Sequence, residues 1–370
     1  MSTSAGRTLA WRAAAALVLS LIATAAFAAK TRTVVLIVCD GLRWQEVFTG
    51  ADPLLLGTAA GGAWAPTPLL RERYWRDDPA ARRAALLPFL WHTVARRGQI
   101  FGNRLRGSDA TVTNGRAFSY PGYDEMSVGY ADPRIDSNEF GPNPNVSVFE
   151  WLNAQPRFHG RVAIYGTWGT FAEIFNEARS HLPMQVGWHP PADRPGMPSL
   201  ALLRRLYATT TRFDEELPPD AYLQIPLLQY VRGGRVRVLF VGYGETDDWA
   251  HQGRYDLVLD AAHRFDGFVA ELWHTMQSMP EYRGRTTFLI TTDHGRGSGP
   301  VQWKDHGVEE PGSENIWLAA IGPDTRPLGE RHDTAPITQS QIAATLAAFV
   351  GEDYRKAVPR AAPPILDVLR

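Results

Sequence analysis

Three apolar, β-branched runs, each followed by a carboxylate, constrain the fold of this chain more than any other feature. The runs and their acids are residues 34–39 with Asp40, 236–243 with Asp247, and 287–292 with Asp293. Runs of this kind form strands that are buried on both faces of a parallel sheet. Because open parallel sheets bind ligands beyond the carboxyl ends of their strands, these three ends can converge in space. The sequence therefore predicts an α/β domain with a functional site at that edge.

Histidines accompany these acids at spacings that suit metal binding. His251 lies four residues after Asp247, which puts both side chains on one face if a helical turn forms, while His294 follows Asp293 directly and His306 comes shortly afterwards. Asp and His without a Cys thiolate suit zinc, with manganese or iron as alternatives, and leave positions open for substrate oxygens. A single Asp at a strand end is often a turn former or a helix cap. The repeated coincidence instead favours two metal sites that share one pocket.

A serine lies between the first two acids. Residues 114–126 predict a tight loop that leads into a helix, and Ser119 lies within this segment. With this serine included, the order of the motifs resembles that of the alkaline phosphatase superfamily. The motifs are Asp40-Gly41, Ser119-x-Pro121, Asp247-x-x-x-His251, Asp293-His294-Gly295 and His306-Gly307. The chain looks most like the nucleotide pyrophosphatase/phosphodiesterase branch and related exported bacterial phosphatases. The resemblance runs from residue 34 to about the end, where residues 339–347 resemble the closing helix of the superfamily.

The resemblance implies an alkaline-phosphatase-like fold, with a mostly parallel central sheet flanked by helices and with cap insertions. It also implies two divalent metal ions, for which we expect Zn²⁺, with Mn²⁺ or Fe as alternatives. The implied ligand sets are Asp247, His251 and His306 for one metal, and Asp40, Asp293, His294 and the Ser119 oxygen for the other. Ser119 occupies the position of the nucleophilic Thr or Ser.

Two further residues are expected to bind the substrate phosphate. Asn138 lies in a stretch that resembles the one carrying the phosphate-binding Asn of the family, although the spacing is slightly short. Lys304, two residues before His306, is close enough in sequence to reach the phosphate, and a solvated lysine is the alternative. The chain departs from the diesterase branch at Gly122 and Tyr123, where that branch usually has Asn and His. Because of these departures, the resemblance to the diesterase branch is weaker than the resemblance to the superfamily.

The expected activity is hydrolysis of small-molecule phosphate esters. A Ser hydroxyl is a poor nucleophile at its free pKa, and coordination to a divalent metal favours its alkoxide without a neighbouring His base. The resulting hypothesis is a double displacement through a phosphoseryl intermediate on Ser119. The sequence leaves open whether the substrate is a monoester or a diester, because that choice depends on residues in the insertions.

Three alternatives remain. A sulfatase shares the superfamily, but its Cys/Ser-x-Pro-x-Arg signature has Tyr123 in place of the Arg here. A cofactor-independent phosphoglycerate mutase arranges a serine and two metals similarly, but acts on cytoplasmic metabolites. A non-catalytic extracellular protein with a metal-dependent binding site is the third alternative, and the complete ligand set argues against it.

The first 28 residues have the pattern of a secretory signal peptide. Arg7 and Arg12 precede an apolar stretch at residues 13–26, and Ala26-Phe27-Ala28 has the small-x-small form of a cleavage site. An uncleaved anchor is the alternative, although the stretch is short for a membrane span. Loss of two Arg and no acid leaves a slightly acidic mature chain, which indicates no nucleic-acid-binding surface. We therefore expect an exported protein, periplasmic or secreted, with no stable membrane span.

Residues 29–370 are expected to form a single domain with insertions at about 51–98 and 181–234. Pro-rich loop signals surround a helical pattern at residues 200–213 in the second insertion, and a long amphipathic helix is predicted for residues 256–276. Cys39 is the only cysteine and falls inside the first strand, so it is predicted to be a core residue rather than part of a disulfide. The sequence predicts no oligomeric state.

Overall fold

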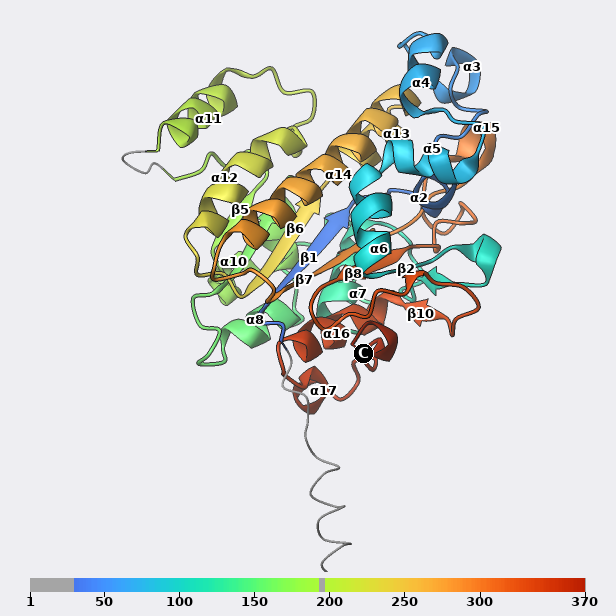
Figure 1. The fold of residues 1–370 in the computed structure, drawn as a ribbon. Coiled ribbons are helices and arrows are strands. Elements are labelled where there is room, and N and C mark those ends of the chain that lie inside the picture. Colours follow the sequence, from blue (N-terminus) through green and yellow to red (C-terminus); the bar gives the residue numbers. More distant parts are fainter. Residues whose placement is uncertain (1–29, 193–196, 370) are drawn as a thin grey trace, which may run out of the picture.

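An eight-stranded sheet forms the centre of the computed structural model, which describes residues 30–192 and 197–369 (Figure 1). The strand order is β5-β4-β6-β1-β7-β8-β2-β9. The strands are β1 (Thr33–Cys39), β2 (Gln99–Phe101), β4 (Val162–Gly166), β5 (Met184–Val186), β6 (Val238–Tyr243), β7 (Thr286–Thr291), β8 (Leu318–Ile321) and β9 (Gly329–Glu330). The strands from β5 to β7 pair in parallel, and β8 runs antiparallel to both β7 and β2. The predicted mostly parallel α/β sheet is therefore confirmed.

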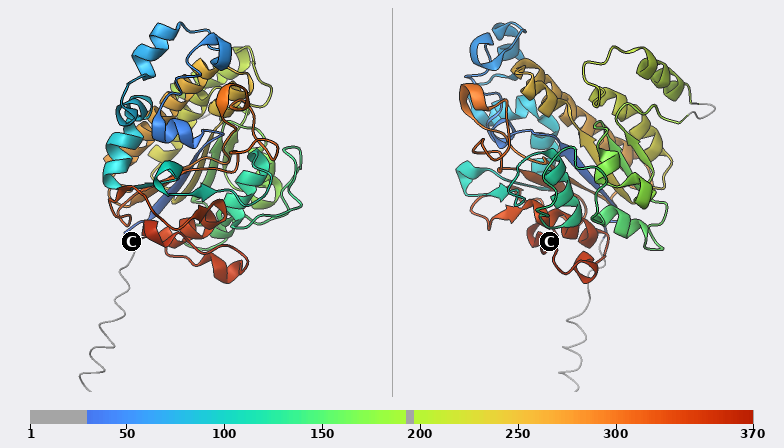
Figure 2. Two further views of the ribbon diagram at one scale, coloured as in Figure 1. Left: turned by 90° about the vertical axis from the view of Figure 1, so that its right-hand side faces the viewer. Right: turned by 180° about the vertical axis from the view of Figure 1, so that it is seen from behind.

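Alternate side chains of β1 enter two separate cores. Val35, Ile37 and Cys39 pack on one side, and Val34 and Leu36 on the other. The first side is covered by α2 (Trp44–Thr49), α4 (Thr67–Tyr74), α5 (Pro79–Leu86), α12 (Asp220–Arg232) and α14 (Tyr255–Ser278). The second is covered by α7 (Ser119–Val128), α8 (Val148–Asn153), α9 (Phe171–Ile174), α16 (Ile342–Phe349) and α17 (Tyr354–Ala357), as the view from behind shows (Figure 2). A strand with helices on both faces must be apolar throughout, which explains the unbroken run in the sequence.

The remaining elements have seven residues or fewer, apart from one helix of 12 residues. They are α3 (Thr58–Gly61), a π-helical turn (Leu90–Val94), α6 (Ala95–Arg97), a 3₁₀ turn (Arg104–Arg106), β3 (Ala110–Thr111), α10 (Glu177–Ser180), α11 (Pro198–Thr209), α13 (Glu245–His251), α15 (Gly299–Gln302), β10 (Ile337–Thr338) and 3₁₀ turns at Gln339–Gln341 and Leu366–Leu369. Strands β3 and β10 form a separate two-stranded parallel sheet.

The predicted secondary structure agrees closely with these elements. The three apolar runs form β1, β6 and β7, and the long amphipathic helix is α14. The helix expected at residues 200–213 ends at Thr209, because the chain becomes extended at Thr210. The second insertion also contains α12, which begins at Asp220 directly after the Pro218-Pro219 pair. Cys39 is buried and free, as predicted.

The two proposed insertions lie in different places relative to the sheet. Residues 51–98 pack against the core on the α14 side, and α3 and α4 lie near α13 at one end of the molecule (Figure 1). Residues 181–234 supply α11, α12 and the loop between them. The predicted signal peptide lies outside the described residues. Within residues 30–192 and 197–369, no helix combines the length and the apolar character needed to span a bilayer.

Candidate metal centre

The carboxyl ends of three neighbouring strands bring the predicted acids together. Strand β1 lies between β6 and β7, with Cys39 beside Tyr243 and Val38 beside Thr291. Asp40 follows β1 directly, and α13, which carries Asp247 and His251, follows β6 after a single glycine. The helical turn predicted for these two residues is therefore present. Asp293 and His294 come just after β7, so all five side chains start from one edge of the sheet.

The first group of potential ligands is Asp40, Asp293 and His294, whose ligand atoms all lie within 4.8 Å of one another. His294 Nε2 is 3.4 Å from Asp40 Oδ1 and 3.3 Å from Asp293 Oδ2. His294 Nδ1 donates to the Gly295 carbonyl at 2.8 Å, which leaves Nε2 as the ring atom with a free lone pair. The structure thus brings together the three protein ligands that the family resemblance implied for one metal.

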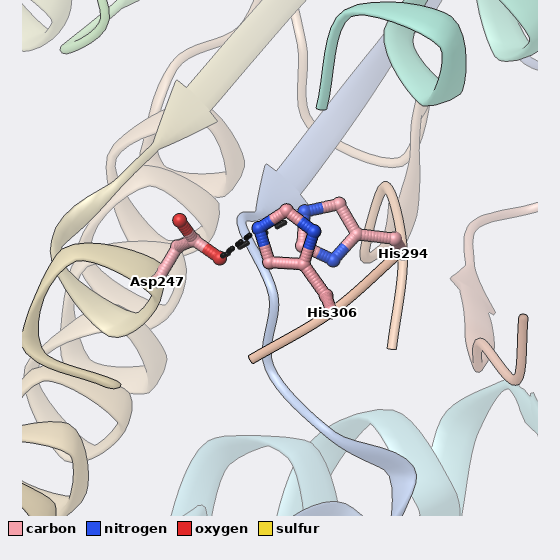
Figure 3. Close-up of side chains that lie close together, drawn as sticks. All are labelled: Asp247, His294 and His306. Carbon is pink, nitrogen blue, oxygen red and sulfur yellow. Dashed lines mark ion pairs between the residues drawn. The ribbon is translucent and has the colours of Figure 1, made fainter. Parts of the chain in front are cut away.

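The second group is Asp247, His294 and His306, which Figure 3 shows side by side. His306 Nε2 lies 3.7 Å and His294 Nε2 3.8 Å from Asp247 Oδ1. His251 lies next to this group, with its Nε2 2.9 Å from His306 Nε2 and 3.2 Å from Asp247 Oδ2. The implied set of Asp247, His251 and His306 is therefore also assembled, and His294 lies between the two sets.

The charge state of the cluster fits divalent cations. Burial, followed by the nearby Asp247, raises the pKa of Asp40 well above its usual range, and burial together with Asp40 does the same to Asp293. Asp40 Oδ1 and Asp293 Oδ2 are buried without a hydrogen-bond partner among the described residues. Burial and the neighbouring His294 lower the pKa of His306 to about 2, so its imidazole is neutral, the form that binds metals. Cations between these groups would satisfy oxygens that the described residues leave unpaired.

Ser119 is the first residue of α7 and lies against the same cluster. Its hydroxyl oxygen is 3.4 Å from His294 Nε2, and the residue is buried. The preceding loop is held by Glu125, whose carboxylate accepts the backbone N–H groups of Thr113 and Asn114 at 2.9 and 3.0 Å. The loop and helix predicted around Ser119 are therefore present, and the serine faces the ligands that the resemblance assigned to it.

Gly122 explains how α7 comes so close to the end of β7. A Cβ atom at this position would lie 2.5 Å from the backbone oxygen of Asp293, closer than any real contact of this kind. The helix that carries Ser119 can therefore approach the Asp293-His294 turn only because residue 122 has no side chain. The departure from the family pattern noted at this position has a steric reason in this chain.

Three residues that support the cluster had not been assigned roles from the sequence. Tyr123 donates its hydroxyl to Asp40 Oδ2 at 3.0 Å, and Arg296, almost fully buried, donates to both the carboxylate and the backbone oxygen of Asp247. Burial alone would raise the pKa of Asp247, but Arg296 and the neighbouring histidines hold it well below its usual range. Gln339 donates to the Asp293 carbonyl at 2.6 Å. In the sequence, only their positions next to the recognised motifs could have indicated these supporting roles.

A cavity of about 320 Å³ opens over the cluster. Its lining includes the predicted residues Asp40, Ser119, Asn138, Asp247, His251 and His306. Asn138 Oδ1 accepts the N–H of Tyr120 at 2.9 Å, which leaves the amide NH₂ as the group that can donate to a ligand. Lys304 does not line this cavity; its side chain lies against Gly253. We therefore do not include Lys304 among the residues that can contact the substrate phosphate.

Other residues of this cavity had been given no role from the sequence. They are Glu139, Trp168, Asp214, Glu216, Leu217, Gly244 and Asp248. Three of them, Asp214, Glu216 and Leu217, belong to the second insertion, in the loop between α11 and α12. None of the described lining residues comes from residues 51–98. The second insertion, and not the first, therefore contributes to the described wall of the site.

Comparisons with known proteins identify the fold. No protein-family model matches the sequence, and no curated protein matches it either. Among solved structures, the alkaline phosphatase PafA matches with a TM-score of 0.59 at 10% identity, over 92% of this chain and 99% of that chain. A phosphonate monoester hydrolase from Silicibacter pomeroyi matches with a TM-score of 0.54 at 14% identity, over 92% and 76% of the two chains. A putative sulfatase from Bacteroides thetaiotaomicron matches with a TM-score of 0.55 at 12% identity, over 92% and 75%. The chain therefore shares the α/β fold of these phosphatase and sulfatase structures.

Proposed function

We propose that this protein is a metal-dependent phosphate ester hydrolase of the alkaline phosphatase superfamily, with Ser119 as its nucleophile. The observation that carries the proposal is the convergence of six Asp and His side chains around the hydroxyl of a serine that opens a helix. The fold shared with PafA and with the phosphonate monoester hydrolase supports an ester hydrolase. The geometry around Ser119 supports covalent catalysis.

The two ligand groups would hold two divalent cations, with Zn²⁺ as the first choice and Mn²⁺ or Fe as alternatives. Asp40, Asp293 and His294 would hold one, and Asp247, His251 and His306 the other. When bound, such cations supply Lewis-acid stabilisation of charge on the attacking, leaving and phosphoryl oxygens. The ligand mix leaves coordination positions open for those oxygens.

The protein's own groups orient the substrate. The Ser119 N–H is at the start of α7 and has no acceptor within the helix, so it can donate to a phosphoryl oxygen. The amide NH₂ of Asn138 can donate to a second one. Ser119 Oγ then attacks phosphorus in line with the leaving alcohol, whose bond to phosphorus breaks as the phosphoseryl intermediate forms, and the proton lost by the serine hydroxyl is balanced by the one that the alcohol gains. Hydrolysis of this intermediate by water returns the free serine.

The charge of the cavity favours a diester over a monoester. A phosphomonoester carries about two negative charges near neutral pH, whereas a diester carries one. Among the described residues that line the cavity there is no Lys or Arg to meet the extra charge. The cavity is therefore expected to stabilise the singly charged phosphoryl group of a diester better than the doubly charged group of a monoester. We propose phosphodiesters as the preferred class of substrate.

We also propose that the enzyme acts outside the cytoplasm, because residues 1–28 have the pattern of a cleavable export signal. Fractionation of cells that express the full chain tests this point. The mature protein should appear in the periplasm or the medium with a new N-terminus after Ala28. Retention in the cytoplasm at full length would contradict export.

Hydrolysis assays on metal-replete protein test the activity. Bis-p-nitrophenyl phosphate, p-nitrophenyl phosphate and p-nitrophenyl sulfate should be compared at equal concentration, and the diester should be hydrolysed fastest. Ser119→Ala should abolish nearly all turnover while the metal content stays the same. Ser127→Ala serves as the control, because it removes a hydroxyl from the same helix that, among the described residues, donates only to the Asp124 carbonyl. Full activity of Ser119→Ala would refute the covalent step, and preferential turnover of the sulfate ester would identify a sulfatase instead.

A further inference from the structure

Four carboxylates that belong to neither metal-ligand group line the active-site cavity. They are Glu139, Asp214, Glu216 and Asp248. None of the four forms an ion pair with a Lys or Arg in the part of the chain that the structure describes. The cavity therefore presents negative charge to whatever lies beside the phosphoryl group, although a phosphate ester is itself an anion. With the phosphoryl group bound at the proposed cations, these acids disfavour a further negative group beside it and favour a positive one.

An aromatic ring connects one of these acids, Glu216, to the metal cluster. Trp168 packs against Tyr123, with their ring centroids 6.4 Å apart, and Tyr123 in turn donates to Asp40. The indole N–H of Trp168 donates to Glu216 Oε2 at 2.7 Å, which fixes the carboxylate next to the ring. An aromatic ring beside a carboxylate is the combination that recognises an ammonium group, through attraction to the ring and to the charge.

The loop that carries Glu216 is held in place by its own hydrogen bonds. Asp214 Oδ1 accepts the backbone N–H groups of Glu216 and Leu217, both at 2.7 Å. Leu217 also lines the cavity and adds an apolar surface for the carbon atoms of a substrate. Two of the four acids, Asp214 and Glu216, thus belong to a hydrogen-bonded loop of the second insertion.

The same cavity reaches the candidate metal centre. Asp40 is buried, lines the cavity and has an Oδ1 atom without a hydrogen-bond partner among the described residues. The volume of about 320 Å³ is sufficient for a small ligand. The four acids are not part of either group of potential metal ligands found in the described chain. An organic cation fits this wall better than a further metal ion does.

We propose that the preferred substrates are phosphate esters in which one substituent carries an ammonium group, of the choline or ethanolamine kind, which binds against Trp168 and Glu216. The proposal rests on the phosphodiesterase activity proposed above. The phosphoryl group would be bound at Ser119, and the ammonium group would extend toward the acidic wall. The net charge of such a diester is zero, and the acidic wall favours its positive group.

A pair of isosteric substrates tests this specificity. p-Nitrophenyl phosphorylcholine and p-nitrophenyl 3,3-dimethylbutyl phosphate have the same leaving group and nearly the same shape, but only the first carries a positive charge. We expect kcat/KM to be at least about tenfold higher for the choline ester, since cation–π and ionic attraction in a partly enclosed site contribute energies of that order. The preference should decrease as the salt concentration rises.

Variants of neighbouring glutamates locate the preference. Glu216→Gln should reduce the ratio of the two kcat/KM values several-fold, and Trp168→Leu should do the same. Glu215→Gln removes the same charge from the same loop, but Glu215 is exposed, pairs with Arg212 and does not line the cavity, so the ratio should not change.

The outcomes separate this inference from the proposed function. Equal turnover of the two esters, or an equal loss of preference in both glutamate variants, would overturn the ammonium site and leave the phosphodiesterase intact. Failure to hydrolyse either ester, or bis-p-nitrophenyl phosphate, would overturn the proposed function itself. A preference for the choline ester that is lost in Glu216→Gln and kept in Glu215→Gln would support the inference.

Discussion

Substitution of Gly122 by alanine should damage the active site without touching any side chain that takes part in the chemistry. The added Cβ would lie 2.5 Å from the backbone oxygen of Asp293. To reach the 3.0–3.4 Å range of tight contacts, α7 and the end of β7 must separate by roughly 0.5–0.9 Å. The added Cβ is fixed by the backbone of α7, and its partner is a backbone atom of the turn after β7, so neither can avoid the contact by rotating a side chain.

This displacement separates Ser119 from the ligand cluster, because Ser119 opens α7 and His294 follows Asp293. A misplacement of about 1 Å in a catalytic group typically lowers the rate by about 10²-fold. We therefore expect kcat/KM of Gly122→Ala to fall by roughly that factor. Overpacking costs about 1–3 kcal/mol, but alanine regains up to about 1 kcal/mol of helix propensity, so the net loss of stability should be only about 0–2 kcal/mol.

The assay compares kcat/KM, metal content and the free energy of unfolding of the wild type, Gly122→Ala and a matched control. Gly267→Ala is the control, because Gly267 lies in α14 and its Cβ would meet no atom within 4 Å. That variant should keep full activity and gain up to about 1 kcal/mol of stability. Activity of Gly122→Ala within threefold of the wild type, in a folded protein, would show that the contact with Asp293 does not set the position of Ser119.

Two further predictions concern stability. Removal of divalent cations with a chelator should lower the unfolding temperature, because it leaves Asp40 and Asp293 buried without the cations proposed to neutralise them. At a cation concentration of about 1,000 times Kd the loss corresponds to about 4 kcal/mol, and an unfolding temperature that is identical with and without cations would contradict the metal sites. Burial raises the pKa of Asp266 to about 7, so the folded protein retains a proton there that the unfolded chain has already lost above about pH 4. As the pH rises from about 4 to 7, the free energy of unfolding should therefore fall by up to about 4 kcal/mol through this group. Denaturant titrations at several pH values should show a smaller decline in Asp266→Asn. A decline of equal size in this variant would refute the raised pKa.

The recognised motifs were predictable because each combines a strand pattern with a polar residue at its end. The apolar runs before Asp40 and Asp293 define both the strand and the edge at which the acid lies. The spacing of Asp247 and His251 required only one helical turn, which α13 provides. In these places local sequence determines local structure, and sheet order then brings the ends together.

Residues without a motif could not be assigned in the same way. Lys304 lies close to His306 in sequence, yet its side chain lies against Gly253 and away from the cavity lining. Arg296 follows the Asp293-His294-Gly295 motif, but its contact with Asp247 depends on how α13 packs against the loop after β7. The helix expected up to residue 213 ends earlier, and the loop that follows contributes Glu216 to the cavity.

The sequence by itself determined the chemistry of this protein: a parallel sheet, the acids and imidazoles at its carboxyl edge, and a serine at the start of a helix. These features follow from periodicity, spacing and ligand type, which are properties of short segments. Only the tertiary structure decided which side chains line the cavity over the ligand cluster. The acidic wall, the ring of Trp168 and the close approach at Gly122 each join segments that are far apart along the chain, and such contacts depend on packing that no local pattern records.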